Sequence, residues 1–344
     1  MAQPVISYPG AKWRFYPHMV EYFPTDMKVF IEPFLGGGSV TLSVADDPRF
    51  TKLERMIAGD LAPEQWAFWT GVKTCPDDTM SVAEQWFRQT CPHQIMLAEQ
   101  GYDGTKMRQY VSGDLSLDDE SLSEDDKSRI INGMELYNEA IKEGTAFWEW
   151  AAKVDCSNLS IAERAARIFL VNRISFSGMG DSGSLSKDQF CNFRLDKIQL
   201  IKNASPLLNR VEIYNVSFEE TMKFAHQNPS ESFIFLDPPY YKQEGSGLYG
   251  KNGDTHRGFP HEHFAEFTKS MPCKWFITYD DSVKVRKMFR GKTANGEKCY
   301  IMPFTIPGGY TMAGKTAEDA LAGEEVFIAN YDIKNMNKFD LSSL

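Results

Sequence analysis

The sequence predicts an α/β fold built around a doubly wound sheet, with a separate and mostly helical region inserted into it. Two stretches carry this prediction. The apolar segment 29–32 is followed by three consecutive glycines at 36–38 and then by a helical stretch. A second apolar segment, 232–236, ends abruptly in Asp-Pro-Pro-Tyr at 237–240. Strands that stop at a glycine turn or a carboxylate deliver these groups to the sheet edge where ligands bind.

The glycine stretch predicts a nucleoside-binding loop in the first half of the sheet. Gly36 and Gly38 let the backbone turn tightly and approach a ligand, with helix N–H groups directed at it. A dinucleotide motif would need a further glycine where Thr41 stands. A second strand over 56–58 leads to Asp60, 22 residues after Gly38, a spacing at which an acid can accept ribose hydroxyls. The alternative for Asp60 is an N-cap of the following helix.

The pattern between the two halves of the sheet changes to helical. We expect three segments: 1–64 as the cofactor-binding first half, 65–206 as an inserted helical domain, and 207–344 as the catalytic second half. Aromatic residues recur at helical spacings in the insertion, and the apolar stripe over 160–175 predicts a helix. After residue 207 we expect strands at 211–214 and 274–279, and a hairpin formed by the apolar segments 300–304 and 325–329.

One sector of this acidic chain is basic. Residues 164–210 contain eight Lys and Arg side chains against three Asp, whereas the whole chain has a net charge of −10. Basic residues interleaved with phenylalanines predict a surface that contacts phosphates. The alternative is an ordinary solvated charged face. The side chains proposed to contact the nucleic acid are Arg173, Lys187, Arg194 and Lys197.

The composition excludes several other classes of protein. No apolar run reaches the length of about 18 residues that a membrane span needs, and the N-terminus has no signal-peptide pattern, so we predict a cytoplasmic protein with no membrane partner. The six cysteines are scattered without a Cys-x-x-Cys pair, which favours free thiols over a metal site. No feature predicts an oligomeric state.

The corner at 237–240 is suited to a flat ligand that carries an amino group. Pro238 and Pro239 fix the backbone and lack N–H groups, so the Asp237 carboxylate and the Pro238 carbonyl are acceptors. Hydrogen bonds from both N–H groups of an amine such as adenine N6 would free its delocalised lone pair. Tyr240 would stack on the ring, worth about 1–3 kcal/mol. A base in a duplex would first have to be flipped out.

The order of these motifs resembles the Dam-type DNA adenine-N6 methyltransferases. The motifs that carry the resemblance are Tyr8-Pro9-Gly10-Ala11-Lys12, the Glu-Pro-Phe-Leu-Gly-Gly-Gly-Ser-Val run at 32–40, Asp60, Asn172-Arg173 and the Asp-Pro-Pro-Tyr corner at 237–240. The resemblance extends over nearly the whole chain. It implies S-adenosylmethionine as the cofactor, a Rossmann-like methyltransferase sheet, and an inserted DNA-recognition domain acting on double-stranded DNA.

The resemblance also implies roles for individual residues. The expected cofactor contacts are Tyr8, Lys12, Phe34, Gly36, Gly38, Asp60, Phe218 and Asp237. The expected catalytic residues are Asp237, Pro238, Pro239 and Tyr240, and no metal is expected. Arg173 matches a basic position of the recognition region. The segment after Gly178 differs from the family pattern, so no recognition sequence is predicted.

Two other functions are compatible with the same corner, because it recognises only a planar amine. One is methylation of an RNA adenine or a protein amide. The other is DNA binding by a homologue without catalysis, although the intact Asp237 and Tyr240 argue against it.

Overall fold

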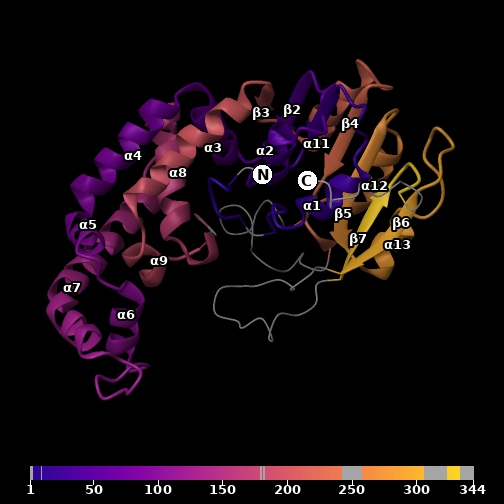
Figure 1. Cartoon of the computed structure of the whole chain (residues 1–344). Coiled ribbons are helices and arrows are strands. Elements are labelled where there is room, and N and C mark those ends of the chain that lie inside the picture. The colour runs from indigo at the N-terminus through magenta and orange to yellow at the C-terminus, as the bar shows by residue number, and fades with distance from the viewer. Residues whose placement is uncertain are drawn as a thin grey trace. The chain divides into compact units, whose positions relative to one another are not determined.

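The computed structural model describes residues 3–8, 10–178, 180, 183–241, 258–305 and 324–333. The chain forms two compact units (Figure 1). The sheet unit contains Met1–Pro4, Gly10–Trp69 and Pro206–Leu344, and the helical unit contains Val5–Pro9 and Thr70–Ser205. The predicted segments divide instead at 64/65 and 206/207.

The differences at the boundaries have local causes. In the sheet unit, the indole N–H of Trp69 donates to the Gly36 carbonyl at 2.9 Å, so residues 65–69 stay with the glycine loop. In the helical unit, the Asn172 side chain donates to the Ser7 carbonyl at 2.6 Å and accepts the Ser7 N–H at 2.8 Å. These two bonds tie Ser7, and with it the described residues 5–8, to the helical unit.

The sheet has seven strands in the order β3-β2-β1-β4-β5-β7-β6. Their bounds are β1 Val29–Glu32, β2 Arg55–Gly59, β3 Val211–Tyr214, β4 Ser232–Leu236, β5 Lys274–Asp280, β6 Tyr300–Thr305 and β7 Glu324–Ala329. The first five are parallel, whereas β7 is antiparallel to both β5 and β6. The predicted strands and the pairing of the two last segments are confirmed. Successive strands run outwards from β1 in one direction and from β4 in the other, so the ligand crevice of this topology lies where β1 and β4 end.

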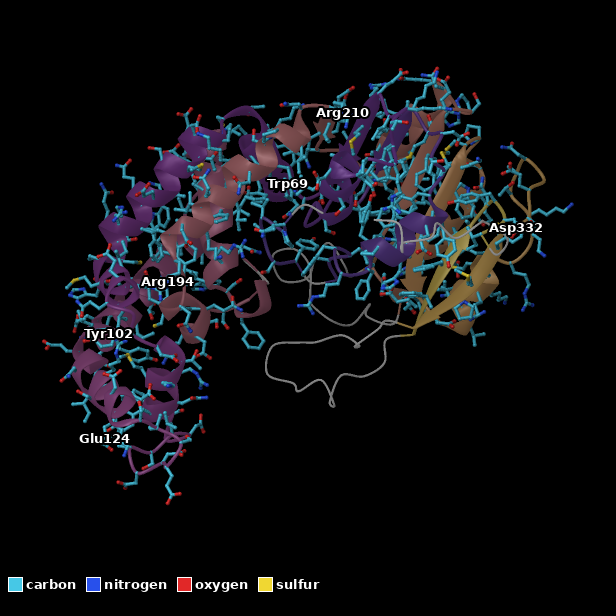
Figure 2. All side chains as sticks on the ribbon, in the orientation of Figure 1. Trp69, Tyr102, Glu124, Arg194, Arg210 and Asp332 are labelled. Carbon is cyan, nitrogen blue, oxygen red and sulfur yellow. The ribbon has the colours of Figure 1, made fainter. Side chains whose placement is uncertain are left out.

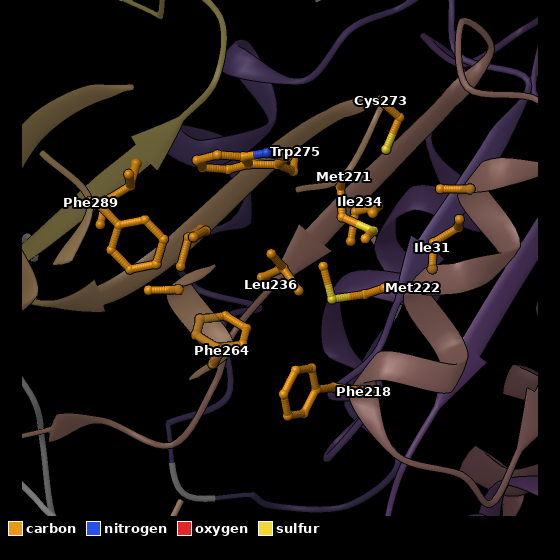
Figure 3. Close-up of a cluster of buried hydrophobic side chains, with 14 of the residues drawn as sticks. Ile31, Phe218, Met222, Ile234, Leu236, Phe264, Met271, Cys273, Trp275 and Phe289 are labelled. Carbon is orange, nitrogen blue, oxygen red and sulfur yellow. The ribbon is translucent and has the colours of Figure 1, made fainter. Parts of the chain in front are cut away.

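Both faces of the sheet are buried, as a parallel sheet requires. One face carries Ile31, Ile234, Leu236 and Trp275, each completely buried, against the apolar sides of helices (Figure 3). On the other face, the ring of Phe23 lies 4.9 to 5.6 Å from three phenylalanines of β4 and β5, namely Phe233, Phe235 and Phe276. These two layers fix the positions of the strand ends.

Short helices of the sheet unit cover it. They are α1 Tyr16–Met19, α2 Ser39–Asp46, α11 Phe218–Met222, α12 His261–Lys269 and α13 Val283–Met288. Helices α11, α12 and α13 contribute Met222, Phe264 and Val285 to the face drawn in Figure 3. Ser217 and Ser282 cap the N-termini of α11 and α13, because each hydroxyl accepts a first-turn N–H.

The helical unit is built from helices of 5 to 30 residues. Their bounds are α4 Pro76–Thr90, α5 Pro92–Glu99, α6 Gly104–Ser112, α7 Glu124–Lys153, α8 Ile161–Ile174, α9 Lys187–Cys191 and α10 Gln199–Ala204, and α3 Pro63–Thr74 crosses the boundary between the units. Helices α7 and α8 begin with capping boxes at Ser123 and Ser160. Helix α8 confirms the helix predicted over 160–175.

The described ranges contain no candidate for a membrane-spanning helix or a metal site. None of their helices combines the length and apolarity needed to cross a bilayer. No three His, Cys, Asp or Glu side chains there are placed to hold a metal ion. None of the six cysteines forms a disulfide.

Candidate active site

Lys12 joins the glycine loop to the end of β4. Asp237 follows the last residue of β4, and its Oδ1 lies 3.0 Å from Nζ of Lys12. The same ammonium donates to the Gly10 carbonyl at 2.9 Å, while the Lys12 backbone N–H donates to Oγ of Ser39, the first residue of α2, at 3.1 Å. Lys12 is only 2% exposed. A buried ammonium requires such compensation, so the Lys12–Asp237 pair fixes this edge of the sheet.

The Asp237 carboxylate is held through one oxygen. The Thr278 hydroxyl, on β5, donates to Oδ1 at 2.7 Å, on the same oxygen that Lys12 contacts. Among the described residues, Oδ2 accepts no hydrogen bond. Pro238 is buried and Pro239 half-buried, so the turn that follows the carboxylate is rigid. One oxygen of Asp237 is therefore available to a ligand.

Tyr240 is held through both its hydroxyl and its ring. Its hydroxyl donates to Oε1 of Glu325, on β7, at 2.8 Å, and its ring stacks on Tyr279 at 5.9 Å between centroids. The Lys12 ammonium lies 4.9 Å from the Tyr240 centroid, within the range of a cation–π contact. Burial raises the pKa of Glu325. The next backbone N–H, of Tyr241, donates to Oδ1 of Asp280 at 2.6 Å.

The glycine loop is tied to the end of β2. The Gly36 N–H donates to Oδ2 of Asp60 at 2.9 Å, and Oδ1 accepts the N–H of Ala62 at 2.9 Å. Asp60 therefore supports the turn that leads into α3. This contact is similar to the N-cap role that the sequence left open for Asp60. Each carboxylate oxygen has a second lone pair, so Asp60 can still accept a ribose hydroxyl. Burial raises the pKa of Asp60 to about 6.

Gly38 requires glycine for two reasons. Its φ of +64° lies in the left-handed region, and a Cβ there would approach the Trp69 ring to 2.4 Å. Gly38 is the N-cap of α2 and has no side chain to cap it. Glu32, at the end of β1, takes that place, because its Oε2 accepts the N–H of Thr41 at 2.9 Å as well as the Thr41 hydroxyl. Burial raises the pKa of Glu32 to about 8.

Phe34 and Phe218 meet beside the loop. Their rings stack at 5.8 Å with an interplanar angle of 25°. Phe218 begins α11 and is largely buried, with Phe264 packed edge-on at 5.5 Å, whereas Phe34 is half-buried. The sheet unit thus brings together, around the ends of β1, β2 and β4, every predicted site residue that belongs to it.

The other predicted residues belong to the helical unit. Tyr8 is half-buried there, and its placement relative to Asp237 stays a prediction. Arg173 is partly buried, donates to the Val5 carbonyl and lies 5.5 Å from the Phe169 ring. Lys187, Arg194 and Lys197 are exposed, although Arg194, labelled in Figure 2, also donates to the Ala98 carbonyl.

Thr278 and Glu325 belong to the site but are not among the residues predicted from the sequence. Thr278 lies inside an apolar strand segment and Glu325 begins one, and both are buried. A buried polar side chain in a strand needs a hydrogen-bond partner. A polar residue in a strand segment was therefore the sequence feature that could have indicated Thr278 and Glu325. The partner itself depends on strand order, because Asp237 and Tyr240 lie 41 and 85 residues away in the sequence.

A doubly wound sheet with a glycine loop after β1 and an Asp-Pro-Pro-Tyr corner after β4 is the arrangement of a methyltransferase. The model of the family of D12 class N6 adenine-specific DNA methyltransferases matches residues 8–100 and 105–300, and the chain belongs to this family. Its activity is methylation of adenine N6 in DNA. The chain is similar to the Type II methyltransferase M.MjaIII of Methanocaldococcus jannaschii, with 22% identity over 306 residues that cover 86% of this chain and 82% of that protein.

Proposed function

We propose that the protein transfers a methyl group from S-adenosylmethionine to N6 of an adenine flipped out of double-stranded DNA, at a defined sequence. The observation that carries the proposal is the Lys12–Asp237 contact of 3.0 Å. It joins the loop that would hold the methyl donor to the acid that would hold the acceptor. The similarity to a Type II methyltransferase supports action at a defined sequence.

The residues around the glycine loop fit the methyl donor. Asp60 keeps lone pairs for the ribose, and the glycines at 36 and 38 bring the backbone close to the ligand. Phe34 and Phe218 offer ring surface for the adenine, and Lys12 and Tyr8 complete the proposed contacts. S-adenosylmethionine, when bound, supplies an electrophilic methyl group whose bond to sulfur breaks as the new nitrogen–carbon bond forms, with the electron pair retained by sulfur.

The corner at 237–240 would prepare the amine. Asp237 and the Pro238 carbonyl accept its two N–H groups, Pro239 keeps the turn rigid, and Tyr240 stacks on the base. These contacts localise the nitrogen lone pair towards the methyl group. After transfer the nitrogen loses one proton, which passes to Asp237 as the acceptor already in place. Positioning of this kind supplies most of the rate acceleration.

The helical segment, 65–206, would bind the DNA and recognise the target. Lys187, Arg194 and Lys197 are exposed and can contact phosphates. Arg173 contributes less directly, because it is partly buried and its guanidinium bonds to the Val5 carbonyl, whereas Arg194 is exposed. A cytoplasmic location, with access to DNA, is part of the same proposal.

The acceptor and the cofactor can be tested together. We expect labelled S-adenosylmethionine to methylate duplex DNA, and to leave RNA and a protein extract unlabelled. Label in RNA or protein would instead support the alternative acceptors, and binding of DNA without any transfer would support a homologue without catalysis. Asp60→Ala should weaken S-adenosylmethionine binding about tenfold or more, as measured by calorimetry, because a charged hydrogen bond is lost.

A further inference from the structure

Two buried polar side chains form hydrogen bonds with the corner at 237–240. Thr278 is 0% exposed on β5, and Glu325 is 2% exposed on β7. Thr278 stands between Ile277 and Tyr279, and Glu325 precedes the apolar run 326–329, so apolar packing of the core does not account for either polar side chain. Each has its hydrogen bond to one member of the corner: Thr278 to Asp237, and Glu325 to Tyr240.

The register of the sheet places Thr278 beside Asp237. Leu236 pairs with Ile277 in the parallel ladder, so the residues that follow each of them are also adjacent. Because the Thr278 hydroxyl and the Lys12 ammonium both bond to Oδ1, rotation of the carboxylate would break two charge-assisted contacts. The half-buried carboxylate therefore has one preferred orientation, with Oδ2 as the available acceptor.

The register also fixes Glu325. It pairs with Asp280 of β5 and with Phe304 of β6, so its backbone is held on both sides. Its carboxylate accepts the Tyr240 hydroxyl from this fixed point at 2.8 Å. A stacking ring that is free to rotate loses conformational entropy when a base binds, and a ring held in place does not.

We infer that Thr278 and Glu325 are positioning residues for methyl transfer: Thr278 turns Asp237 so that Oδ2 receives the substrate amine, and Glu325 holds the Tyr240 ring in its stacking plane. This inference rests on the proposed catalytic role of residues 237–240. Neither side chain touches the reacting atoms. Their effect is transmitted through the groups that do, in the way that supporting hydrogen bonds orient a catalytic site.

Thr278→Val tests the positioning role of Thr278, because valine keeps the shape of the side chain and removes the hydroxyl. We expect kcat for duplex DNA to fall about ten- to a hundredfold, the effect of losing one hydrogen bond to a charged group. S-adenosylmethionine affinity and KM for DNA should stay within about threefold. Thr278→Ser, which restores the hydroxyl, should recover kcat to within about threefold of the wild type.

Thr268→Val is the matched control. Thr268 is a buried threonine near the end of α12 in the same unit, so the change is chemically identical but lies outside the corner. It should leave kcat unchanged. A wild-type kcat in Thr278→Val, or no recovery in Thr278→Ser, would overturn the role of Thr278.

A double-mutant cycle tests Glu325. Glu325→Leu and Tyr240→Phe each remove the same hydrogen bond, and each should lower kcat about tenfold, whereas Glu325→Gln keeps an acceptor and should stay within about threefold of the wild type. In the Tyr240→Phe background, Glu325→Leu should have little further effect. Losses that multiply fully in the double variant would show that Glu325 does not act through Tyr240.

Asp237→Ala separates failure of this inference from failure of the proposed function. If the wild type transfers no methyl group, or Asp237→Ala is as active as the wild type, the proposed role of the corner fails. If those two proteins behave as proposed while Thr278→Val and Glu325→Leu match the wild type, only the positioning inference fails.

Discussion

At the scale of single residues, Tyr240 combines a stacking ring with a fixed hydroxyl. Tyr240→Leu removes the ring, and we expect kcat/KM for duplex DNA to fall at least about fivefold below that of Tyr240→Phe, because base stacking on an aromatic ring contributes about 1–3 kcal/mol. Steady-state kinetics of both variants measure this difference. Equal values for the two variants would show that the ring does not stack on the base.

Glu32 should make stability depend on pH. Its pKa is raised from 4.5 to about 8, so the folded protein keeps a proton that the unfolded chain has already lost in this range. The free energy of unfolding therefore falls as pH rises from about 4.5 towards 8. Glu32→Gln cannot ionise and should show a smaller fall, in urea unfolding curves from pH 5 to 9. Parallel pH profiles for the two proteins would contradict the burial of this carboxyl group.

Residue types alone predict the chemical role of a site residue better than they predict its position and partners in the fold. Asp237 and Lys12 were assigned from motifs, and the structure brings them together at 3.0 Å. Arg173 was assigned from its charge, but charge does not distinguish a phosphate contact from the bond that its guanidinium makes to the Val5 carbonyl. Thr278 could not be assigned, because its partner lies on a neighbouring strand rather than nearby in the sequence.

At the scale of structural elements, the turn into α2 should not tolerate a side chain. Gly38→Ala adds a Cβ at 2.4 Å from the Trp69 ring on a backbone with φ of +64°. Gly296→Ala is the matched control, with φ of +82° and no described neighbour within 4 Å, and its strain alone should cost about 1–2 kcal/mol. We expect Gly38→Ala to lose more stability in urea and also to weaken S-adenosylmethionine binding. Equal losses, with binding intact, would contradict the close packing.

Helices α5 and α7 are joined by an ion pair that titrates. Nδ1 of His93 lies 2.5 Å from Oε1 of Glu143, and this hydrogen bond raises the histidine pKa. The pair therefore stabilises the fold below the ordinary histidine pKa of about 6.5, and this contribution is lost as pH rises through the raised value. Glu143→Gln should lower the His93 midpoint in an NMR titration, and Glu139→Gln should lower it less. An unchanged midpoint in Glu143→Gln would exclude the pair.

The elements themselves were largely predictable. The strands were short apolar segments, of which β1, β2, β4 and β5 end at or beside an acidic residue, and α8 showed a clear helical stripe. The order of the strands was not predictable, because it depends on packing between segments as distant as β1 and β4. The compact units divide near residues 5 and 69 for a similar reason, since this division follows from the hydrogen bonds of Ser7 and Trp69 with residues distant in the sequence.

At the scale of the whole molecule, an acidic chain must confine its DNA contacts to a limited surface. The net charge is −10, and the proposed contacts are the exposed Lys187, Arg194 and Lys197. Replacing these three by glutamine should weaken DNA binding and flatten its salt dependence by about one unit of log–log slope per lost phosphate contact. Lys142→Gln, on α7, removes an equally exposed lysine that pairs with Glu139 and should not change the slope. Fluorescence anisotropy over a range of salt concentrations measures the slope for each variant. An unchanged slope in the triple variant would contradict the proposed phosphate contacts.

If the corner at 237–240 methylates adenine N6 in duplex DNA, the product and its dependence on Asp237 can both be measured. Nucleoside mass spectrometry of DNA incubated with S-adenosylmethionine and either the wild type or Asp237→Ala makes this measurement. We expect N6-methyladenine with the wild type, and a rate at least about a hundredfold lower for Asp237→Ala, the scale of losing a preorganised polar contact to the reacting group. A different methylated nucleoside from the wild type, or an undiminished rate from Asp237→Ala, would contradict this expectation.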